Sequence, residues 1–383
     1  MPGQVEAEQL YPLRMGVCEF CWQVQLLDHL EKTTLFEDHP YLTGTNIPIV
    51  AHFKALADKL SNRYSLSNDD LVIDIGCNDG TLLDQFKTQN LSTLGVEPSS
   101  RISAIAQAKG HVVANVFWGS KTAASLKSLG IKPKLITAMS VFYHVSDLHD
   151  FLNGVELLMG PDSLFVIQAV SLLSLLSKNQ FDHFYHEHTC IHSSSSLLNM
   201  LEDHELKIID IEDFDVHGGS FVATLAHRKS AYPVDPNVNE HAERELKAGL
   251  KTLATYESFG KRAKDIAIHL KAMLVDLNAQ KKRVFGLGAP LKSSTFLNFA
   301  GIDNSLIECL TEVNPFKIGK LSPGKHIPVV DERTLTEEPD YYVVFAWNYL
   351  DFFMEKKRRY LEDGGKFIVP FPKLRVVSSD DLS

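Results

Sequence analysis

Apolar runs alternate with glycine-containing turns and amphipathic segments along most of the chain. The pattern is clearest at 71–98, where an apolar run, a glycine turn, an amphipathic segment and a second apolar run follow one another. Strands that alternate with helices through short connections predict a doubly wound sheet of mostly parallel strands. The predicted strands are 71–73, 94–96, 112–113, 135–138, 164–169 and an antiparallel pair within 208–226.

The same alternation returns in the last third of the chain. A proline-containing stretch at 231–237 is typical of a linker, and 240–280 is an amphipathic helical region. A second strand–turn–helix unit follows at 284–299, and further strands are predicted at 308–313, 342–345 and 366–370. We therefore predict a small N-terminal lobe at 1–60, an α/β domain at 61–230 and a second, Rossmann-like α/β domain at 231–383.

The glycine turn at 76–80 reads G-C-N-D-G, which departs from the G-x-G-x-x-G spacing of sites that bind a pyrophosphate. It carries its own carboxylate, Asp79, which repels a phosphate and attracts a cation. Glu97, about 20 residues after the turn, suits a carboxylate that accepts both ribose hydroxyls. The stretch resembles the first two motifs of class I methyltransferases and favours S-adenosylmethionine (SAM), which carries a sulfonium and an ammonium but no phosphate. Another nucleotide, or a Rossmann unit without a ligand, is the alternative.

Polar residues stand at the carboxyl ends of the predicted strands. In doubly wound sheets these ends meet in one crevice, and the ligand binds there. The residues that we expect at the cofactor are Asp74, Gly76, Asn78, Asp79, Gly80, Glu97, Asn115 and Ser140.

The segment 181–192 concentrates titratable side chains, with four histidines, a tyrosine and acids in F-D-H-F-Y-H-E-H-T-C-I-H. A metal site is one reading, although the zinc-protease pattern H-E-x-x-H fails because it would need a histidine where Cys190 stands. Acid–base chemistry is a second reading, in which Tyr185, Glu187 and His188 remove a proton and hold the resulting oxyanion. A histidine-rich surface loop before a helix at 197–201 is the third.

Composition argues against several classes of function. The net charge of the 383 residues is −10 and no basic cluster is present, so we expect no nucleic-acid partner. The longest apolar run, 164–176, is too short and too often interrupted to span a bilayer, and the N-terminus lacks the apolar core of a signal peptide. We expect no membrane partner, and a cytoplasmic monomer or dimer that acts on a small molecule.

The five cysteines point to reduced thiols rather than to disulfides, because their number is odd and most are isolated. Cys18 and Cys21 form a C-x-x-C, which is half of a zinc ribbon. The sequence contains no second cysteine pair within reach, so we expect two free thiols; a zinc site completed by His29 and His39 is the alternative.

The second strand–turn–helix unit carries groups suited to phosphate. Gly288 lies in its turn, and Lys292 opens its helix together with backbone amides that can bind an anion. Polar loops at 314–319 and 323–329, and Trp347 at a predicted strand end, suggest a nucleotide diphosphate. A purely structural glycine turn is the alternative.

Seven stretches, in order from about 74 to 372, resemble the nucleotide-sugar C-methyltransferases, which make branched deoxysugars from TDP-linked 4-ketohexoses. The stretches are DIGCNDGTLL, VFYHVSDL, FDHFYHEHTCIHSS, VHGGSF, GAPLKSSTFLNFAGI, NPFKIGKLSPGKHIP and AWNYL…GGKFIVPFP. The resemblance implies a class I methyltransferase domain that binds SAM and a C-terminal Rossmann-like domain for the nucleotide sugar. It also implies a zinc-binding N-terminal lobe, of which only the pair Cys18 and Cys21 is present.

The resemblance further implies residue roles. His188 matches the family's proposed base, Tyr185 and Glu187 match its neighbours, and His144 matches a further active-site histidine. The implied reaction is deprotonation of the carbon next to the ketone, with Tyr185 or His144 donating to the oxyanion, and attack of the resulting carbanion on the SAM methyl group. An O- or N-methyltransferase, or a binding protein without catalysis, is the competing interpretation. The residues expected at the nucleotide sugar are Tyr41, Gly288, Lys292, Asn314, Lys317, His326 and Trp347.

Overall fold

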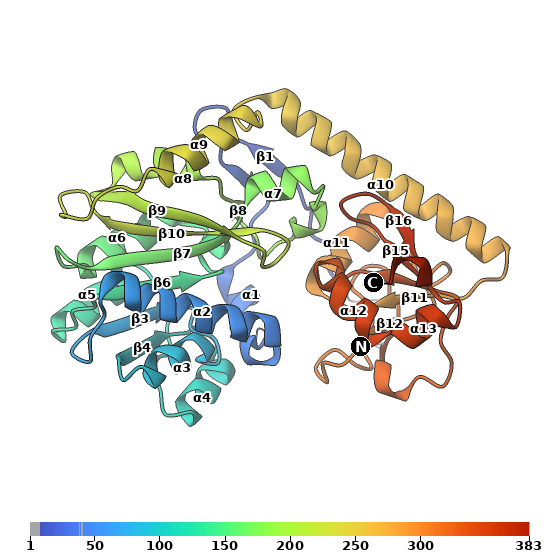
Figure 1. Ribbon diagram of the computed structural model, residues 1–383, viewed down its shortest axis with the longest axis horizontal. Coiled ribbons are helices and arrows are strands. Elements are labelled where there is room, and N and C mark those ends of the chain that lie inside the picture. Colours follow the sequence, from blue (N-terminus) through green and yellow to red (C-terminus); the bar gives the residue numbers. More distant parts are fainter. Residues whose placement is uncertain (1–7, 38, 40, 383) are drawn as a thin grey trace. The chain divides into compact units, whose positions relative to one another are not determined.

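The chain divides into two compact units, each built on its own sheet (Figure 1). The computed structural model describes residues 8–37, 39 and 41–382. The central unit comprises 14–172 and 186–251, and the C-terminal unit comprises 173–185 and 252–382 with the described residues before Arg14. The chain therefore passes between the units three times after Arg14, at 172–173, 185–186 and 251–252.

The central unit contains a seven-stranded sheet in the order β5-β4-β3-β6-β7-β10-β9. The five strands from β5 to β7 are parallel, and β10 pairs antiparallel with both β7 and β9. This is the doubly wound sheet with antiparallel closure that the apolar pattern predicts, and the fold class is confirmed. The strands are β3 (Leu71–Ile75), β4 (Ser92–Val96), β5 (Val112–Ala114), β6 (Leu135–Met139), β7 (Leu164–Val170), β9 (Leu206–Phe214) and β10 (Ser220–His227).

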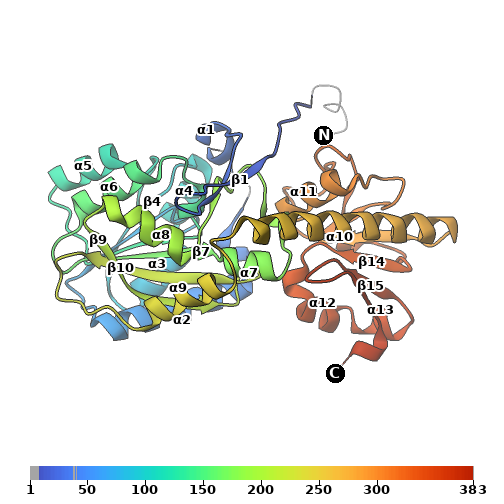
Figure 2. The same cartoon turned by 90° about the horizontal axis from the view of Figure 1, so that it is seen from above.

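Helices cover both faces of this sheet. On one face α2 (Ile47–Tyr64) and α3 (Thr81–Thr88) bury apolar residues against strands β3, β6, β7 and β10. On the other face α6 (Leu148–Leu158) places Phe151 against Phe165 of β7, and Figure 2 shows α5 and α6 across the strands from α2. The unit's other helical segments are α1 (Lys32–Phe36), α4 (Ser100–Ala108), α5 (Ser120–Ser128), α8 (Ser194–Met200), α9 (Asn237–Lys247), η2 (Thr43–Thr45), η3 (Phe142–His144) and η5 (Leu201–Asp203).

Helix α2 illustrates how the sequence sets an element. The Asn46 side chain accepts a hydrogen bond from the Ile49 amide and so caps the first turn, and Ser65 ends the helix in the left-handed conformation. Between these caps the apolar residues recur at helical spacing on one buried face. That face consists of Ile49, Phe53, Leu56, Ala57 and Leu60.

A small antiparallel sheet links the N-terminal segment to the histidine-rich segment. Strands β1 (Met15–Val17) and β2 (Val24–Leu26) form a hairpin, and β8 (Cys190–Ile191) pairs with β2. These strands have two or three residues each, so no periodicity in the sequence could predict them. The Leu26 amide also donates to the Thr189 carbonyl at 2.8 Å, which anchors the residue next to His188.

The C-terminal unit has a six-stranded sheet in the order β13-β12-β11-β14-β15-β16, with only β16 antiparallel. Its first five strands have the order of a dinucleotide-binding fold, as expected from the sequence. The strands are β11 (Val284–Leu287), β12 (Leu310–Glu312), β13 (Val329–Asp331), β14 (Tyr341–Val344), β15 (Lys366–Val369) and β16 (Arg375–Val377). The helical segments are α7 (Leu172–Ser177), η4 (Phe181–His183), α10 (Leu253–Ala279), α11 (Leu291–Ala300), η6 (Glu332–Thr334), η7 (Trp347–Tyr349), α12 (Leu350–Lys356), α13 (Arg358–Glu362) and η8 (Ser379–Asp381).

The helical region predicted at 240–280 is divided in the structure. Helix α9 ends before Gly249, which has a positive φ of 81°, and α10 begins at Leu253. The boundary between the two units falls at this break, while the proline-containing stretch 231–237 lies within the central unit. Among the described residues, no helix combines the length and the apolar character that crossing a bilayer requires.

Candidate active site

A cavity of about 230 Å³ opens at the carboxyl ends of the central strands. Gly76 and Asn78, which follow β3, line it together with Glu97 after β4 and Ser140 after β6. Since β3 lies between β4 and β6, these side chains meet at the point where the strand order reverses, the usual ligand site of such sheets. Residues at the predicted strand ends therefore line a common cavity.

The turn after β3 depends on its first glycine. Gly76 has a φ of +69°, and its amide donates to the Val96 carbonyl at 2.7 Å. A Cβ at this position would lie 2.5 Å from Cγ2 of Val141, a stiff side chain that lines the cavity. Both the backbone conformation and the lack of space therefore require glycine.

Glu97 is fixed at the wall of the cavity by two backbone amides. Its Oε2 accepts from the Asn78 amide at 3.0 Å and its Oε1 accepts from the Ser99 amide at 2.8 Å. Burial raises the pKa of Glu97, and the two amide hydrogen bonds act in the opposite direction. A carboxylate has about four acceptor positions, so Glu97 can still accept two further donors. This arrangement fits the two hydroxyls of a ribose.

Four of the eight residues expected at the cofactor do not line the cavity. Asp79 accepts from the Gly44 amide at 2.9 Å and from the Thr81 hydroxyl at 2.6 Å, so it fastens η2 to the turn instead of facing a ligand. The Asn115 amide donates to the Glu97 and Pro98 carbonyls at 2.8 and 2.9 Å and so shapes the wall. Gly80 starts α3 at a positive φ of 79°, and Asp74 is buried beneath the turn.

Apolar and aromatic residues that the sequence did not single out complete the cavity. Phe117 and Trp118 stand three and four residues after the end of β5 at Ala114, and Ile102 comes from α4. The Lys32 ammonium lies 4.8 Å from the centre of the Phe117 ring. An aromatic pair in the loop just after a predicted strand was the signal that could have revealed this wall, which suits a flat base such as adenine.

Asp74 carries an unusual pKa within this site. Only 3% of the residue is exposed, and its Oδ1 accepts from the Thr137 hydroxyl at 2.7 Å. Burial raises the pKa of the carboxyl to about 7, although the Thr137 hydroxyl bond lowers it. The folded protein therefore binds the Asp74 proton more tightly than the unfolded chain does, so folding stability falls as the pH rises from the ordinary aspartate range towards 7.

We expect the substitution Asp74→Asn to remove this pH dependence. The amide oxygen can still accept from Thr137 and does not titrate. The free energy of unfolding of the variant, relative to that of the wild type, should therefore rise by about 2 kcal/mol between about pH 5 and pH 7. Denaturant unfolding of SAM-free protein at both pH values measures the difference. Asp84→Asn, at an aspartate of α3 whose side chain is 39% exposed, is the control that should show no such gain. An equal offset at both pH values would contradict the assignment.

His144 lines the cavity, and Glu187 and His188 of the histidine-rich segment lie next to it. Nδ1 of His144 lies 2.6 Å from the Glu187 carbonyl oxygen, which can only accept, so Nδ1 carries the proton. The desolvated ring of His144 has a lowered pKa, so the neutral form is favoured and its Nε2 is an acceptor. His188 is 3% exposed, and its ring centroid lies 5.1 Å from that of His144 and 4.6 Å from that of Tyr143.

The tautomer of His144 changes one expected role. A neutral imidazole that donates through Nδ1 cannot also donate through Nε2, so His144, which lines the cavity, is suited to accept a hydrogen bond there rather than to supply one to an oxyanion. Glu187 is held from the other side, because its Oε2 lies 3.2 Å from Nε2 of His39. His144, Glu187 and His188 are thus brought together within the central unit.

Comparisons with known proteins identify the family of the chain. A family model described as a methyltransferase domain matches residues 50–211, and one described as a C-methyltransferase C-terminal domain matches 215–372. The chain is 32% identical over 374 residues to the C-methyltransferase NovU of Streptomyces niveus, which covers 97% of this chain and 89% of that protein. The chain belongs to the C-methyltransferase family. It is therefore a SAM-dependent enzyme, and the choice between carbon and oxygen or nitrogen as the methylated atom is decided in favour of carbon.

Solved structures resemble this C-methyltransferase in fold alone. A SAM-dependent methyltransferase from Clostridium acetobutylicum is 14% identical with a TM-score of 0.37, over 46% of this chain and 92% of that chain. The magnesium protoporphyrin IX methyltransferase of Synechocystis, solved with bound SAM, is 15% identical with a TM-score of 0.36, over 50% of this chain and 86% of that chain.

The candidate residues of the C-methyltransferase are divided between its units. Of the residues expected at the nucleotide sugar, Tyr41 lines the cavity of the central unit and the others belong to the C-terminal unit. The catalytic candidate Tyr185 also belongs to the C-terminal unit. There Gly288 adopts a φ of +81° directly after β11, and Asn314 accepts from the Phe316 amide at 2.9 Å. Lys317 donates to the Ala289 carbonyl at 2.9 Å, and Nε2 of His326 lies 2.7 Å from a Glu8 carboxylate oxygen.

Among the described residues of this C-methyltransferase, no fitting set of ligands is found for the zinc lobe that the family resemblance implies. Cys18 and Cys21 are free thiols in the turn between β1 and β2. Within the described part of the chain, no three histidine, cysteine or acidic side chains are grouped so that they could hold a metal ion. A structural zinc site needs four ligands, so we assign no role to zinc.

Proposed function

We propose that the enzyme methylates the carbon next to the ketone of a TDP-linked 4-keto-deoxysugar, a step in the biosynthesis of branched deoxysugars. The observation that carries the proposal is a pair of histidines at the SAM cavity: His144, which is neutral and lines the cavity, and His188, whose ring lies 5.1 Å from that of His144. Methylation of carbon requires removal of a C–H proton, and that in turn requires a base at the methyl donor. Membership of the C-methyltransferase family and the sequence motifs shared with the nucleotide-sugar enzymes support the substrate class.

We assign proton removal to His188, the motif histidine, and expect this step to contribute about 10²–10⁴-fold to the rate. Bound SAM supplies an electrophilic methyl group. His144 presents Nε2 as an acceptor, which fits a hydroxyl of the sugar. The Tyr185 hydroxyl then remains as the donor to the enolate oxygen, a contribution similar in size to that of other preorganised oxyanion donors. Glu187, whose carbonyl oxygen fixes the His144 tautomer, completes the set.

The two domains divide the ligands in this proposal. The central unit, which contains the predicted domain 61–230 except 173–185, holds SAM, with Gly76, Asn78, Glu97 and Ser140 at the cavity wall and Asp74, Asp79, Gly80 and Asn115 in the structure that supports this wall. The C-terminal unit, which contains the predicted domain 231–383 from residue 252 onwards, holds the nucleotide diphosphate. The turn at Gly288 and the first amides of α11 supply donors for its phosphates, as helix N-termini commonly do.

Mass spectrometry of the reaction products tests the proposal directly. Incubation of the enzyme with SAM and TDP-4-keto-6-deoxyglucose should yield S-adenosylhomocysteine and a sugar nucleotide heavier by one methylene group. NMR of the product should show a new carbon–carbon bond next to the former ketone. TDP-glucose, which lacks the ketone and hence the acidic C–H, is the control that should not react. Methylation of the control, or of oxygen in either sugar, would contradict the proposal.

A further inference from the structure

The ammonium group of Lys292, which the sequence assigned to phosphate binding, is already surrounded by protein groups. Its Nζ lies 3.3 Å from Oδ2 of Asp182 and 3.2 Å from Oδ1 of Asn348. It also lies 4.2 Å from the centre of the Trp347 ring. An ammonium has three hydrogens, and Asp182, Asn348 and the Trp347 ring provide one partner for each of them. The Lys292 side chain is 12% exposed and that of Asp182 is 3% exposed, so little of either is left for a phosphate.

Asp182 lies at the start of the catalytic segment and is held from a second direction. The indole nitrogen of Trp347 donates to the same Oδ2 at 2.8 Å. Lys292 comes from α11, which follows β11, and Trp347 comes from η7, which follows β14. Both side chains therefore bind the same carboxylate from the carboxyl ends of two neighbouring strands. Tyr185 follows Asp182 by only three residues, and the chain enters the central unit at His186.

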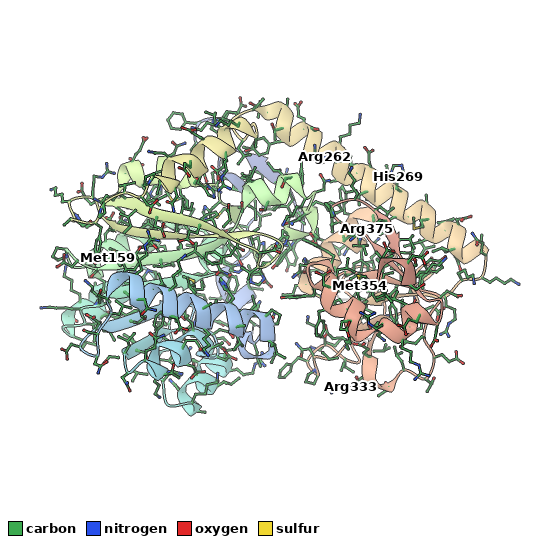
Figure 3. All side chains as sticks on the ribbon, viewed as in Figure 1. Met159, Arg262, His269, Arg333, Met354 and Arg375 are labelled. Atoms are coloured by element: carbon green, nitrogen blue, oxygen red, sulfur yellow. The ribbon has the colours of Figure 1, made fainter. Side chains whose placement is uncertain are left out.

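Neighbouring contacts fix the rest of this segment within the C-terminal unit. The Thr295 hydroxyl of α11 donates to the Phe184 carbonyl at 2.9 Å, and the Phe181 ring stacks on Phe296 with centroids 5.0 Å apart. Arg262, labelled on α10 in Figure 3, donates to the Asn179 side chain at 2.6 Å. The segment is thus tied to α10 and α11 up to the residue before Tyr185.

We propose that Lys292 and Asp182 are positioning residues for methyl transfer, and that their ion pair, held by Trp347, sets the backbone from which Tyr185, Glu187 and His188 follow. Neither side chain touches a reacting atom in this proposal. Their effect passes through the chain between 182 and 188, where a displacement of the catalytic groups by about 1 Å can lower the rate by about 100-fold. Lys292 is thereby reassigned from the phosphate of the substrate to the geometry of the active site.

Burial makes this pair sensitive to the loss of either partner. Desolvation raises the pKa of Asp182 and lowers that of Lys292, and each group counteracts the shift of the other. If one partner is removed, an uncompensated charge stays buried, whereas neutral replacement of both partners is often tolerated. The double substitution should therefore restore the rate that either single substitution lowers. If Lys292 bound a phosphate of the substrate, the double substitution would not restore the rate.

The kinetic test compares Lys292→Met, Asp182→Asn, the double variant and Lys292→Arg, with TDP-4-keto-6-deoxyglucose as the probe. We expect kcat to fall by about 100-fold in each of the variants Lys292→Met and Asp182→Asn, with little change in KM. In the double variant kcat should be at least about tenfold higher than in either single variant. Lys292→Arg should lower kcat as Lys292→Met does, because a planar guanidinium is larger than the ammonium that is buried here. If Lys292 bound a phosphate of the substrate instead, arginine would replace it well. Lys282→Met and Asp340→Asn, at an exposed ion pair of the same unit, are the matched controls.

Hydrogen exchange of the free enzyme tests the same inference without turnover. The amides of 184–188 should exchange faster in Lys292→Met and return towards the wild-type rate in the double variant. Since this measurement needs no substrate, it decides even if the sugar probe of the proposed function is not methylated. Calorimetry with SAM shows that the central unit of each variant is folded. A rise in KM alone, rescue by arginine or unchanged exchange would overturn the inference.

Discussion

We expect His188→Asn to lower kcat by about 10²–10⁴-fold, the contribution of a positioned general base, while the affinity for SAM stays within a few-fold. Asparagine keeps a similar size but has no nitrogen that can accept a proton at neutral pH. The SAM cavity is lined by other residues, so its binding energy should survive. The loss should therefore appear in the chemical step rather than in cofactor binding.

Deuterium uptake isolates that step. In D₂O, with S-adenosylhomocysteine in place of SAM, the wild type should exchange the proton next to the ketone of TDP-4-keto-6-deoxyglucose, and His188→Asn should not. His186→Asn, two residues earlier in the same segment, is the matched control and should exchange normally. His144→Asn separates the two histidines, because its amide can still donate to the Glu187 carbonyl. If exchange stops in His144→Asn and continues in His188→Asn, the base is His144 and the assignment is wrong.

The strands and the cofactor turn could be predicted from the sequence because their causes are local. Apolar runs such as 71–73 and 135–138 are buried strands, and a glycine is required at position 76 by a positive φ. The helical region at 240–280 was predicted as continuous, since a single Gly249 is often tolerated within a helical pattern. In the structure this glycine ends α9, and the boundary between the units lies next to it.

Side-chain roles were harder to predict because they depend on long-range pairing. Asp79 has the residue type and position of a cofactor ligand, yet its carboxylate is used by Gly44 and Thr81. Lys292 has the position of a phosphate ligand, yet Asp182, 110 residues earlier in the chain, lies against it. Spacing along the sequence tells which residues share an edge of a sheet, but it does not tell which of them already have a partner.

We expect Glu97→Gln to weaken SAM binding by about 100-fold, which corresponds to the loss of a hydrogen bond to a charged group together with distortion of its support. Both carboxylate oxygens accept a backbone amide, from Asn78 and from Ser99. The NH₂ group of glutamine can only donate, so it must face one of these two amides, donor against donor. The substitution therefore removes an acceptor for the ribose and also displaces the glycine turn or the start of α4.

Calorimetric titration with SAM measures the effect, and Glu212→Gln is the control, at a glutamate of β9 whose partners are Lys59 and Arg63.

The pH dependence of SAM affinity tests the same role of Glu97. Because burial raises the pKa of Glu97, the carboxylate starts to take up a proton at a higher pH than an ordinary glutamate does. A protonated Glu97 has the same defect as glutamine, so wild-type affinity should fall as the pH drops towards that range, while Glu97→Gln, already weak, should change little. Parallel pH profiles for the two proteins would show that Glu97 does not hold the cofactor.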